Sequence, residues 1–194
     1  MQKNEVINIF KETGAFLKGH FELSSGFHSD EYVQCALVLQ YPLYAEKLAN
    51  ELSHFFLKIP VTCVIGPALG GVTLAYEVAR SLKVRGIFAE RKDGIMQLRR
   101  GFSLSDNESI LVVEDVITTG GSVKEVISLL EKNNKKVVGV GSLIDRSVEK
   151  IDFGYPFHSL LRLPLRAFPP RECPLCKEGK PLSKPGSKKM FNNQ

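Results

Sequence analysis

The sequence predicts an α/β fold with a central parallel sheet flanked by helices and a small N-terminal hood. Two observations favour it. Short aliphatic runs, typified by residues 110–113, lack the polar alternation of half-exposed strands, which is typical of strands buried on both faces. Segments with helical spacing of apolar residues lie between these runs, and alternating strands and helices predict a parallel sheet.

The first third of the chain contributes four predicted elements. Residues 5–13 carry apolar side chains on one face of a helix. Residues 19–34 alternate polar and apolar positions around a Ser-Gly break, which predicts a small hairpin-like layer, the hood. A helix over residues 44–57 and a buried strand over residues 61–65 follow.

A glycine-rich loop, residues 66–73, comes next and leads into a helix over residues 72–82. Its spacing, G-x-x-x-x-G-V-T, differs from the P-loop of nucleotide hydrolases, which has lysine where Val72 stands. Without that lysine, a nucleotide-hydrolysing site lacks its phosphate counter-charge. The loop therefore argues against an NTPase. A short strand over residues 86–89 ends this part of the chain.

The chain is organised around residues 110–124, which read I-L-V-V-E-D-V-I-T-T-G-G-S-V-K. Glu114 and Asp115 follow the aliphatic run, at the edge where open α/β sheets bind ligands. A Thr/Gly/Ser loop comes next, and a helical pattern begins near Ser122. A plain strand, turn and capped helix is the alternative interpretation. The acidic pair and the T-T-G-G-S run together disfavour it.

This loop has the chemistry of a sugar phosphate site. Its two glycines allow a tight turn that aims successive N–H groups at one anion. The hydroxyl groups can donate to phosphate oxygens, and the helix start adds a positive dipole end. The acidic pair can accept hydrogen bonds from sugar hydroxyls. The predicted ribose 5-phosphate site comprises Glu114, Asp115, Val116, Ile117, Thr118, Thr119, Gly120, Gly121 and Ser122.

The motif V-V-E-D-V-I-T-T-G-G-S resembles the phosphoribosyl-pyrophosphate (PRPP) motif of the type I phosphoribosyltransferases. The resemblance implies the fold of that family, PRPP binding by the residues of this loop, and a catalytic role for Asp115. Residues 66–73 resemble the family's pyrophosphate loop. The resemblance also implies that Mg²⁺ arrives bound to the PRPP diphosphate, with no protein side chain named as its ligand.

A basic segment, residues 90–102, separates two predicted strands. On its own, a glycine-bounded basic loop is a solvated hairpin. Arg91 and Lys92 nevertheless match the family's Arg-Lys pair, which implies a catalytic contact with the PRPP diphosphate across a dimer interface. The second lysine and the histidine of the well-studied branch are absent here. Arg99 and Arg100 are candidates to replace them.

Two further strands are predicted, over residues 136–144 and 157–163. Arg146 follows the first of them, on the ligand side of the sheet. It matches the family's arginine that pairs with the orotate carboxylate, since a guanidinium can grip a planar carboxylate with two bonds. An exposed arginine at a strand end is the alternative. With Thr118, Arg146 is the predicted orotate-binding residue.

Residues 19–34, G-H-F-E-L-S-S-G-F-H-S-D-E-Y-V-Q, resemble the hood of the orotate phosphoribosyltransferases, whose strand covers the orotate ring. An exposed aromatic side chain there can stack on a flat pyrimidine. One position departs from the family's better-known members. They carry lysine where this chain has Ser24, so a lysine–phosphate contact does not carry over.

The resemblance extends from about Gly19 to Phe168. It implies transfer of ribose 5-phosphate from PRPP to orotate, giving orotidine 5'-phosphate and pyrophosphate in pyrimidine synthesis. Two alternatives stay open. One is a phosphoribosyltransferase for a purine or another base, which has no use for Arg146 or the hood. The other is a PRPP-sensing regulator that binds RNA or DNA, which needs a basic face on its folded body. The shared loop makes a two-fold dimer the expected assembly.

The 194 residues suffice for one well-buried core, and their composition is that of a soluble protein. No run suits a membrane span or a signal peptide, so a cytoplasmic location is expected. The net charge is +5, but six basic and two acidic residues lie from Arg171 onward. This excess at one end disfavours nucleic-acid binding. We expect one domain over residues 1–170 and a mobile, basic, Pro/Lys-rich tail over residues 171–194.

All four cysteines are expected to stay reduced. Cys35 and Cys63 lie in apolar runs and are typical of core residues. Cys173-Pro-Leu-Cys176 is half of a zinc site, and we find no second C-x-x-C or nearby histidine pair in the sequence to complete it. A dimer supplying four thiolates is the less favoured alternative to a site without metal. The role of this cysteine pair stays open.

Overall fold

A six-stranded sheet forms the centre of the computed structural model, which describes residues 1–23, 25–164 and 166–185. Its strands are β3 (Cys63–Pro67), β4 (Arg85–Lys92), β5 (Ile95–Leu98), β6 (Ser109–Ile117), β7 (Lys136–Asp145) and β8 (Phe157–Arg162). They lie in the order β5-β4-β3-β6-β7-β8. All neighbours are parallel except β5, which pairs antiparallel with β4. The predicted parallel sheet is confirmed, and the basic segment adds an antiparallel edge strand.

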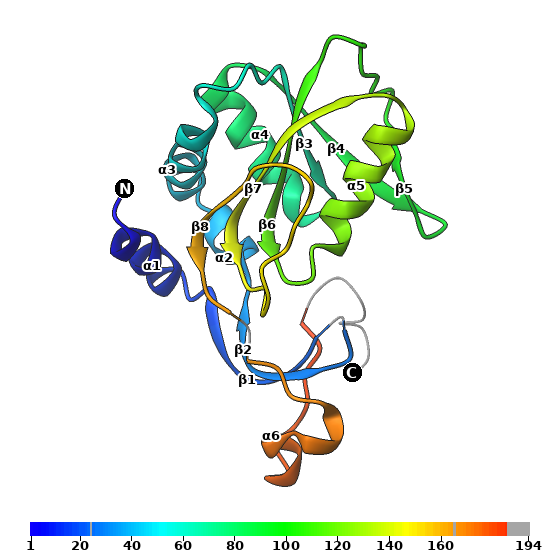
Figure 1. Cartoon of the computed structure of the whole chain (residues 1–194). Coiled ribbons are helices and arrows are strands. Elements are labelled where there is room, and N and C mark those ends of the chain that lie inside the picture. The colour runs from blue at the N-terminus through cyan, green and yellow to red at the C-terminus, as the bar shows by residue number, and fades with distance from the viewer. Residues whose placement is uncertain (24, 165, 186–194) are drawn as a thin grey trace.

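Helices cover both faces of this sheet (Figure 1). They are α1 (Lys3–Glu12), α2 (Ala36–Leu39), α3 (Pro42–Ser53), α4 (Gly70–Leu82) and α5 (Gly121–Lys132), with a 3-10 turn η1 (His54–Phe56) after α3. One hydrophobic cluster joins α1 to α4 with the sheet, and a second joins α5 to its other face. Among the described residues, none of the helices combines the length and apolar character that a membrane crossing requires.

Strand β6 lies in the middle of the sheet, and residues 110–113 have no exposed surface. Leu111 and Val113 contribute to the cluster with α1 to α4, while Ile110 and Val112 contribute to the cluster with α5. Burial on both faces, predicted from the absence of polar alternation, is therefore confirmed. The strand runs on to Ile117, so the acidic pair belongs to backbone that is held in register with β7.

The hood is an antiparallel pair of strands, β1 (Phe16–Glu22) and β2 (His28–Val33), which confirms the predicted hairpin-like layer. It lies opposite the carboxyl ends of the central strands, whose arrowheads point toward it (Figure 1). Position 24, where the family's lysine is replaced by serine, lies outside the described residues. The hood and the sheet edge together enclose the space where the predicted ligand residues meet.

Residues 166–185, here called the C-terminal arm, fold onto the hood (Figure 1). The arm contains a 3-10 turn η2 (Pro170–Glu172) and a short helix α6 (Pro174–Lys177). Phe168 exchanges backbone hydrogen bonds of 2.8 and 2.9 Å with His28 on β2. Ser183 donates to the carbonyl of His20 and accepts from the amide of Glu22, both at 2.8 Å, on β1.

The expectation of a mobile end beginning at Arg171 is therefore wrong for residues 171–185. Both edges of the two-stranded hood offer unpaired N–H and C=O groups, and the arm pairs with each of them. Composition alone does not reveal such pairing, because Pro, Gly and Lys content reports solvation rather than backbone partners. The rest of the predicted tail, residues 186–194, lies outside the described residues.

Candidate active site

A cavity of about 1060 Å³ lies between the carboxyl edge of the sheet and the hood. It collects the predicted ribose 5-phosphate residues, together with Arg91 and Arg146. Lys92 is the one predicted site residue that does not line it. The lining comprises residues 114–122, Pro67 to Gly70, the hood residues Glu22, Leu23, Ser25, Phe27, Tyr32, Val33 and Gln34, and Arg91, Val123, Glu125, Arg146, Val148, Ala167, Lys184 and Pro185.

The loop between β6 and α5 has the backbone shape of an anion site. Gly120 has a φ of 74°, and a Cβ there would lie 2.8 Å from a ring carbon of Phe153, so glycine alone fits. Helix α5 begins at Gly121. The N–H groups of its first turn have no carbonyl partner within the helix, and the residues of that turn line the cavity. An anion placed here meets the first N–H groups of α5, of which that of Gly121 donates to Thr119 Oγ1 at 3.4 Å, and the positive end of a twelve-residue helix.

Glu114 and Asp115 form a half-buried acidic pair at this edge. Burial raises the pKa of Glu114 well above its usual value, and the neighbouring Asp115 charge raises it further. Burial also raises the pKa of Asp115, against hydrogen bonds that lower it. The amide of Val116 donates to Asp115 Oδ1 at 2.9 Å. The pair thus has few donors of its own, which suits it to accept hydrogen bonds from ligand hydroxyls.

The glycine-rich loop after β3 approaches this pair closely. A Cβ on Gly70 would lie 2.6 Å from Asp115 Oδ1, so any side chain there would displace the carboxylate. The peptide bond between Ala68 and Leu69 is cis. The amide of Ala68 donates to the carbonyl of Ala89 at 2.7 Å, which ties the loop to β4. The predicted pyrophosphate loop and the predicted sugar phosphate loop therefore line one cavity.

Arg146 occupies the end of β7, where the sequence placed it, and only 4% of its surface is exposed. Its amide donates to the carbonyl of Ile117 at 2.7 Å, and its Nη1 donates to the carbonyl of Glu31 at 3.3 Å. Burial lowers the pKa of its guanidinium, while the charges of Glu31 and Asp30 raise it. Among the described residues, its Nε has no hydrogen-bond partner. A buried cation with an unused donor at a cavity favours an anionic ligand.

Arg91 reaches the same cavity from the end of β4. Its guanidinium donates to both carboxylate oxygens of Glu125 at 2.9 Å and to Ser122 Oγ at 3.3 Å. The hydrogen bond to Glu125 raises the pKa of Arg91. The side chain is thereby held next to the first turn of α5, on the side of the cavity that the loop between β6 and α5 forms.

The other cations of the basic segment lie elsewhere. Lys92 is exposed at the end of β4 and outside the cavity lining. Arg100 donates to both carboxylate oxygens of Glu90, at 2.8 and 3.1 Å, and Arg99 lies 3.4 Å from the same carboxylate. The structure thus pairs the two candidate replacement arginines with Glu90 and brings neither into the cavity.

The hood brings two aromatic side chains to the cavity that the sequence analysis did not single out. Phe27 is 42% exposed and lines the cavity. An exposed aromatic side chain was expected in the hood, but no particular residue was named. Tyr32 also lines it, and burial raises the pKa of its hydroxyl group. Alternation along β2 could not have found these positions, because Phe27 precedes the strand and the adjacent residues Tyr32 and Val33 both line the cavity.

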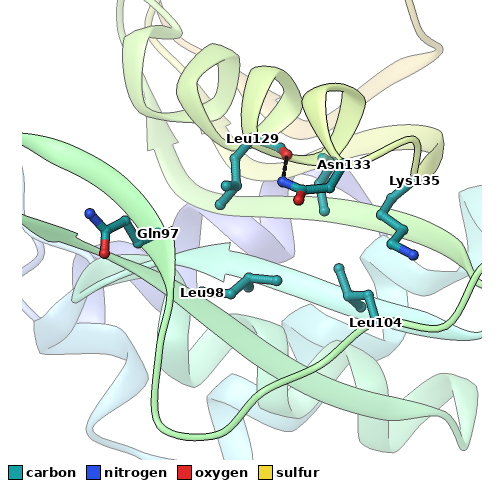
Figure 2. A pocket seen from close by; sticks show the side chains of 7 residues that line it. Gln97, Leu98, Leu104, Leu129, Asn133 and Lys135 are labelled. Atoms are coloured by element: carbon teal, nitrogen blue, oxygen red, sulfur yellow. Dashed lines mark hydrogen bonds between the residues drawn. The ribbon is translucent and has the colours of Figure 1, made fainter.

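A second, smaller cavity of about 360 Å³ lies between β5, the segment after it and the end of α5 (Figure 2). Leucine side chains form much of its wall, and Asn133 Nδ2 donates to the carbonyl of Leu129 at 2.7 Å. Lys135, at its rim, pairs with Asp106 at 2.6 Å. None of the predicted site residues lines this cavity, and its cation is already paired, so it is not the candidate site.

The cysteine pair in the arm has partners that the sequence analysis missed. His20 on β1 and His28 on β2 place ring nitrogens next to the sulfur atoms of Cys173 and Cys176. The search for histidines near the C-x-x-C in the sequence therefore missed this pair. The histidines lie more than a hundred positions away, and only the folding of the arm onto the hood brings them together.

Comparison with known proteins agrees with this geometry. The family model described as "Phosphoribosyl transferase domain" matches residues 43–158. The solved orotate phosphoribosyltransferase of Aeropyrum pernix is 27% identical, with a TM-score of 0.66 over 81% of this chain and 93% of that chain. An adenine phosphoribosyltransferase from Rhodothermus marinus, 20% identical with a TM-score of 0.64 over 82% and 99% of the two chains, shares the fold. Fold and site together define a phosphoribosyltransferase.

Curated relatives show to which family of phosphoribosyltransferases the chain belongs. A protein of Caldanaerobacter subterraneus subsp. tengcongensis named orotate phosphoribosyltransferase is 55% identical over 98% of this chain and 100% of its own length. One of Thermotoga maritima with the same name is 56% identical over 93% and 96%. The chain therefore belongs to the orotate phosphoribosyltransferase family within the phosphoribosyltransferases.

Proposed function

We propose that this chain transfers the ribose 5-phosphate group of PRPP to orotate, releasing pyrophosphate and forming orotidine 5'-phosphate in de novo pyrimidine biosynthesis. One observation carries the proposal. A buried arginine with an unused donor, Arg146, lines the same cavity as the acidic pair and the anion loop. That combination suits a sugar phosphate and a planar carboxylic acid bound side by side. A relative named orotate phosphoribosyltransferase matches 98% of this chain.

PRPP binding is assigned to residues 114–122. The 5-phosphate accepts hydrogen bonds from the first N–H groups of α5 and from the hydroxyl groups of Thr118, Thr119 and Ser122. The carboxylates of Glu114 and Asp115 accept from the ribose hydroxyls. Because burial disfavours both charges, and the charge of Asp115 further disfavours that of Glu114, each such hydrogen bond relieves an existing electrostatic cost.

Orotate is assigned to the hood side of the cavity. Its carboxylate pairs with the guanidinium of Arg146, whose Nε has no hydrogen-bond partner among the residues that the structure describes. The ring lies against Phe27 of the hood, and the hydroxyl group of Thr118 reads its polar edge. A purine has no carboxylate to offer Arg146, so burying that cation would go uncompensated. This difference favours orotate over adenine or guanine.

In the reaction, the bond from C1' to the pyrophosphate oxygen breaks and a bond from C1' to the orotate ring nitrogen forms. The electrons of the broken bond leave with pyrophosphate, and the ring nitrogen gives up its proton. We name no general base. Arg91, held beside the phosphate loop, stabilises the charge that develops on the leaving group. Positioning of the two substrates supplies most of the remaining rate enhancement.

A cavity edge rich in carboxylate and hydroxyl oxygens fits a hard divalent cation. Mg²⁺ bound to the PRPP diphosphate supplies further neutralisation of the leaving group. Asp115 and Glu114 accept hydrogen bonds from the ribose hydroxyls of PRPP. We assign no protein side chain as a ligand of the Mg²⁺ ion.

The active assembly is a two-fold dimer in the cytoplasm. Lys92 supports this assignment, because it is exposed and lies outside the lining of the cavity in its own chain. A dimer that shares the β4–β5 hairpin brings Lys92 to the diphosphate in the partner's cavity. Four free cysteines among the described residues suit a reducing compartment.

The test is orotate consumption, followed by absorbance, with the purified protein, PRPP and Mg²⁺. The Arg146→Gln variant removes the cation and keeps the length of the side chain. We expect orotate to be consumed only when PRPP is present, and kcat/KM for orotate to fall about 10²- to 10³-fold in the variant.

Arg162→Gln is the matched control, since Arg162 pairs with Asp145 on the neighbouring strand and lies outside the cavity lining. It should retain the parent activity within about twofold. Consumption of adenine or guanine in place of orotate would overturn the choice of base. Binding of PRPP without consumption of any base would overturn the proposed reaction itself.

A further inference from the structure

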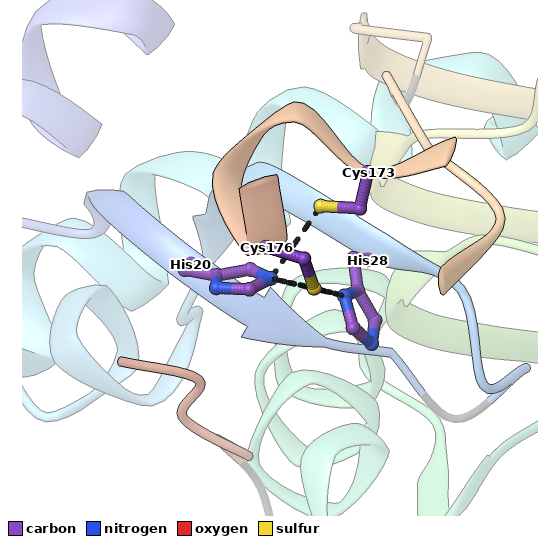
Figure 3. Close-up of side chains that lie close together, drawn as sticks. All are labelled: His20, His28, Cys173 and Cys176. Atoms are coloured by element: carbon purple, nitrogen blue, oxygen red, sulfur yellow. Dashed lines mark hydrogen bonds between the residues drawn. The ribbon is translucent and has the colours of Figure 1, made fainter. Parts of the chain in front are cut away.

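Four side chains from three segments converge where the C-terminal arm packs against the hood (Figure 3). His20 lies on β1 and His28 on β2. Cys173 directly precedes α6, and Cys176 lies within it. One ligand atom from each lies within 4.8 Å of all the others. The exposed fractions of His20, His28 and Cys173 are 4%, 6% and 0%, and Cys176 alone reaches solvent. We refer to these four residues as the His2Cys2 cluster.

Three of the distances between ligand atoms in the cluster match tetrahedral coordination, and all the distances lie within 4.8 Å. In a zinc site with bonds of about 2.3 Å to sulfur and about 2.0 Å to nitrogen, neighbouring ligand atoms lie about 3.3–3.8 Å apart. Cys173 Sγ and Cys176 Sγ lie 3.5 and 3.7 Å from His20 Nε2, and Cys176 Sγ lies 3.3 Å from His28 Nδ1. The two ring nitrogens are 2.9 Å apart and need to separate by only about 0.4 Å.

The hydrogen bond on the far side of His20 sets its tautomer. His20 Nδ1 lies 2.9 Å from the carbonyl oxygen of Lys180, which can only accept. Nδ1 therefore carries the proton, and Nε2 presents its lone pair to the cluster. A backbone carbonyl that orients a histidine in this way is the usual outer support of a metal ligand.

Without a cation, the polar atoms of the cluster do not satisfy one another. The lone pair of His20 Nε2 is approached by three groups, His28 Nδ1 and the two thiols. If His28 Nδ1 carries a proton and donates it to His20 Nε2, neither thiol has a ring-nitrogen acceptor. If it carries none, Cys176 can donate to it, but two nitrogen lone pairs then face each other at 2.9 Å in a largely buried place. A cation bound by two thiolates and two neutral imidazoles uses all four lone pairs at once.

We propose that the His2Cys2 cluster binds one Zn²⁺ ion in a closed, structural site. Two thiolates and two imidazoles form a ligand set typical of structural zinc, and four protein ligands leave no open position for chemistry. The ion is separate from the magnesium that accompanies PRPP, since the cluster has no residue in common with the cavity lining. The inference also stands apart from the proposed reaction.

The ion ties the C-terminal arm to the hood. Two ligands lie on the hairpin and two on the arm, so binding closes a connection between positions 156 residues apart. The backbone pairings of Phe168 and Ser183 flank the ion on either side of the hairpin. Beyond Ser183 the arm passes the cavity, which Lys184 lines. The zinc site thus fixes the part of the arm that borders the active site.

The first test is the metal content of the full chain purified without chelators, in a buffer that keeps thiols reduced. We expect about one equivalent of zinc per chain, and one equivalent of Co²⁺ bound by the apoprotein with the visible spectrum of tetrahedral sulfur coordination. Neither measurement requires PRPP, orotate or activity. Failure of the zinc proposal and failure of the proposed reaction are therefore distinguishable.

Cys176→Ser and His28→Gln each remove one ligand, and His54→Gln is the matched control because His54 is an exposed histidine outside the cluster. Both ligand variants should lose zinc affinity by more than about 100-fold, since even outer-shell partners are worth 10- to 100-fold. His54→Gln should bind zinc like the parent. Because Cys176 is exposed, its serine variant is expected to fold, which near-ultraviolet circular dichroism can verify.

Limited trypsin digestion reports the position of the arm. The arm offers cleavage after Arg171 and Lys177, whereas Lys180 and Lys184 are each followed by proline and are not cut by trypsin. We expect the zinc-loaded chain to resist cleavage there, and both the chelated parent and the Cys176→Ser variant to be cut at least about tenfold faster. A chain that neither carries zinc nor binds Zn²⁺ or Co²⁺ would overturn the proposal. So would a disulfide between Cys173 and Cys176 in freshly purified protein, or equal zinc binding by all three variants.

Discussion

The active-site cavity and the His2Cys2 cluster are built in opposite ways. The cavity takes most of its predicted ligand residues from one continuous stretch, residues 114–122, on the rigid edge of the central sheet. The cluster takes its four side chains from three segments that meet only in the folded chain. The ligand residues of the cavity can be predicted from the sequence because they are continuous. The cluster cannot, because it depends on which distant segments pair.

The two regions also differ in their electrostatics. In the cavity, burial raises the pKa of both Glu114 and Asp115, so the folded chain is destabilised by charges that the proposed ligand needs. In the cluster, bound zinc would add stability, because the ion binds only when the arm is docked. One region gives up stability for binding, and the other gains stability through binding.

The largest expected effect comes from Asp115→Asn. The amide keeps an acceptor for the amide of Val116 but loses the charge that binds ribose hydroxyls. We expect kcat/KM for PRPP to fall about 10²- to 10³-fold, while the melting temperature of the ligand-free chain rises by about 2–4 °C at neutral pH. Activity loss with a gain in stability would confirm that the acidic pair is retained for binding.

The pH dependence of that stability gain has a defined sign. A carboxyl whose pKa is raised in the folded state costs nothing below its unfolded pKa of about 4, and the cost grows as the pH rises toward the folded value. The melting temperature of Asp115→Asn should therefore exceed that of the parent at pH 7 and match it near pH 4. Asp152→Asn, an exposed change outside the cavity lining, should alter neither activity nor stability by a measurable amount. A lower melting temperature for Asp115→Asn at pH 7 would contradict the argument.

The contrast between the two regions explains how far sequence reasoning reached. The β6 strand, the loop after it and the start of α5 were predicted because each element follows its neighbour in the chain. Arg146 was placed correctly because it directly follows a strand whose end had to lie on the ligand side. Such inferences need only local pattern and the direction of parallel strands.

What was missed depends on pairing between distant segments. His20 and His28 looked like unremarkable hood residues until the arm placed two thiols beside them. Lys184 lay in what composition described as a solvated tail, yet it lines the cavity. The β5 strand was expected as a loop, because four residues at a sheet edge carry too short a pattern to distinguish. Tertiary pairing supplied each of these features.

Variants of Lys92 test whether a second chain contributes a residue to the cavity. We expect Lys92→Ala alone to lose about 10²-fold in kcat/KM. A hybrid dimer of Lys92→Ala and Asp115→Asn subunits, isolated with two affinity tags, contains one intact site if the hairpin is shared. Its activity should recover to about half that of the parent dimer.

A hybrid of Asp115→Asn with Arg146→Gln is the matched control, because both residues line the cavity of their own chain. Each site of that hybrid keeps one lesion, so no activity should return. Absence of recovery in the Lys92 hybrid as well would mean that Lys92 acts, if at all, within its own chain.

The smallest expected effect lies where the two regions meet, at Lys184. Its ammonium pairs with Glu22, and both residues line the cavity, so it adds positive charge near two anionic substrates. For an exposed ion pair worth about 0.2–1 kcal/mol, Lys184→Ala should raise KM about 1.5- to 5-fold and leave kcat unchanged. Lys180→Ala removes the same charge from the arm outside the cavity, and its KM should stay at the parent value.

Combining Lys184→Ala with Cys176→Ser shows whether zinc is what holds the lysine in place. If the arm leaves the hood when the metal site is broken, the single Cys176→Ser variant already has the raised KM, and adding Lys184→Ala changes nothing further. A coupling energy equal to the effect of Lys184→Ala alone is then expected from the four KM values. Full additivity would instead mean that the backbone pairings of Phe168 and Ser183 hold the arm without the ion. The zinc site would in that case stabilise the hood without positioning Lys184 at the cavity.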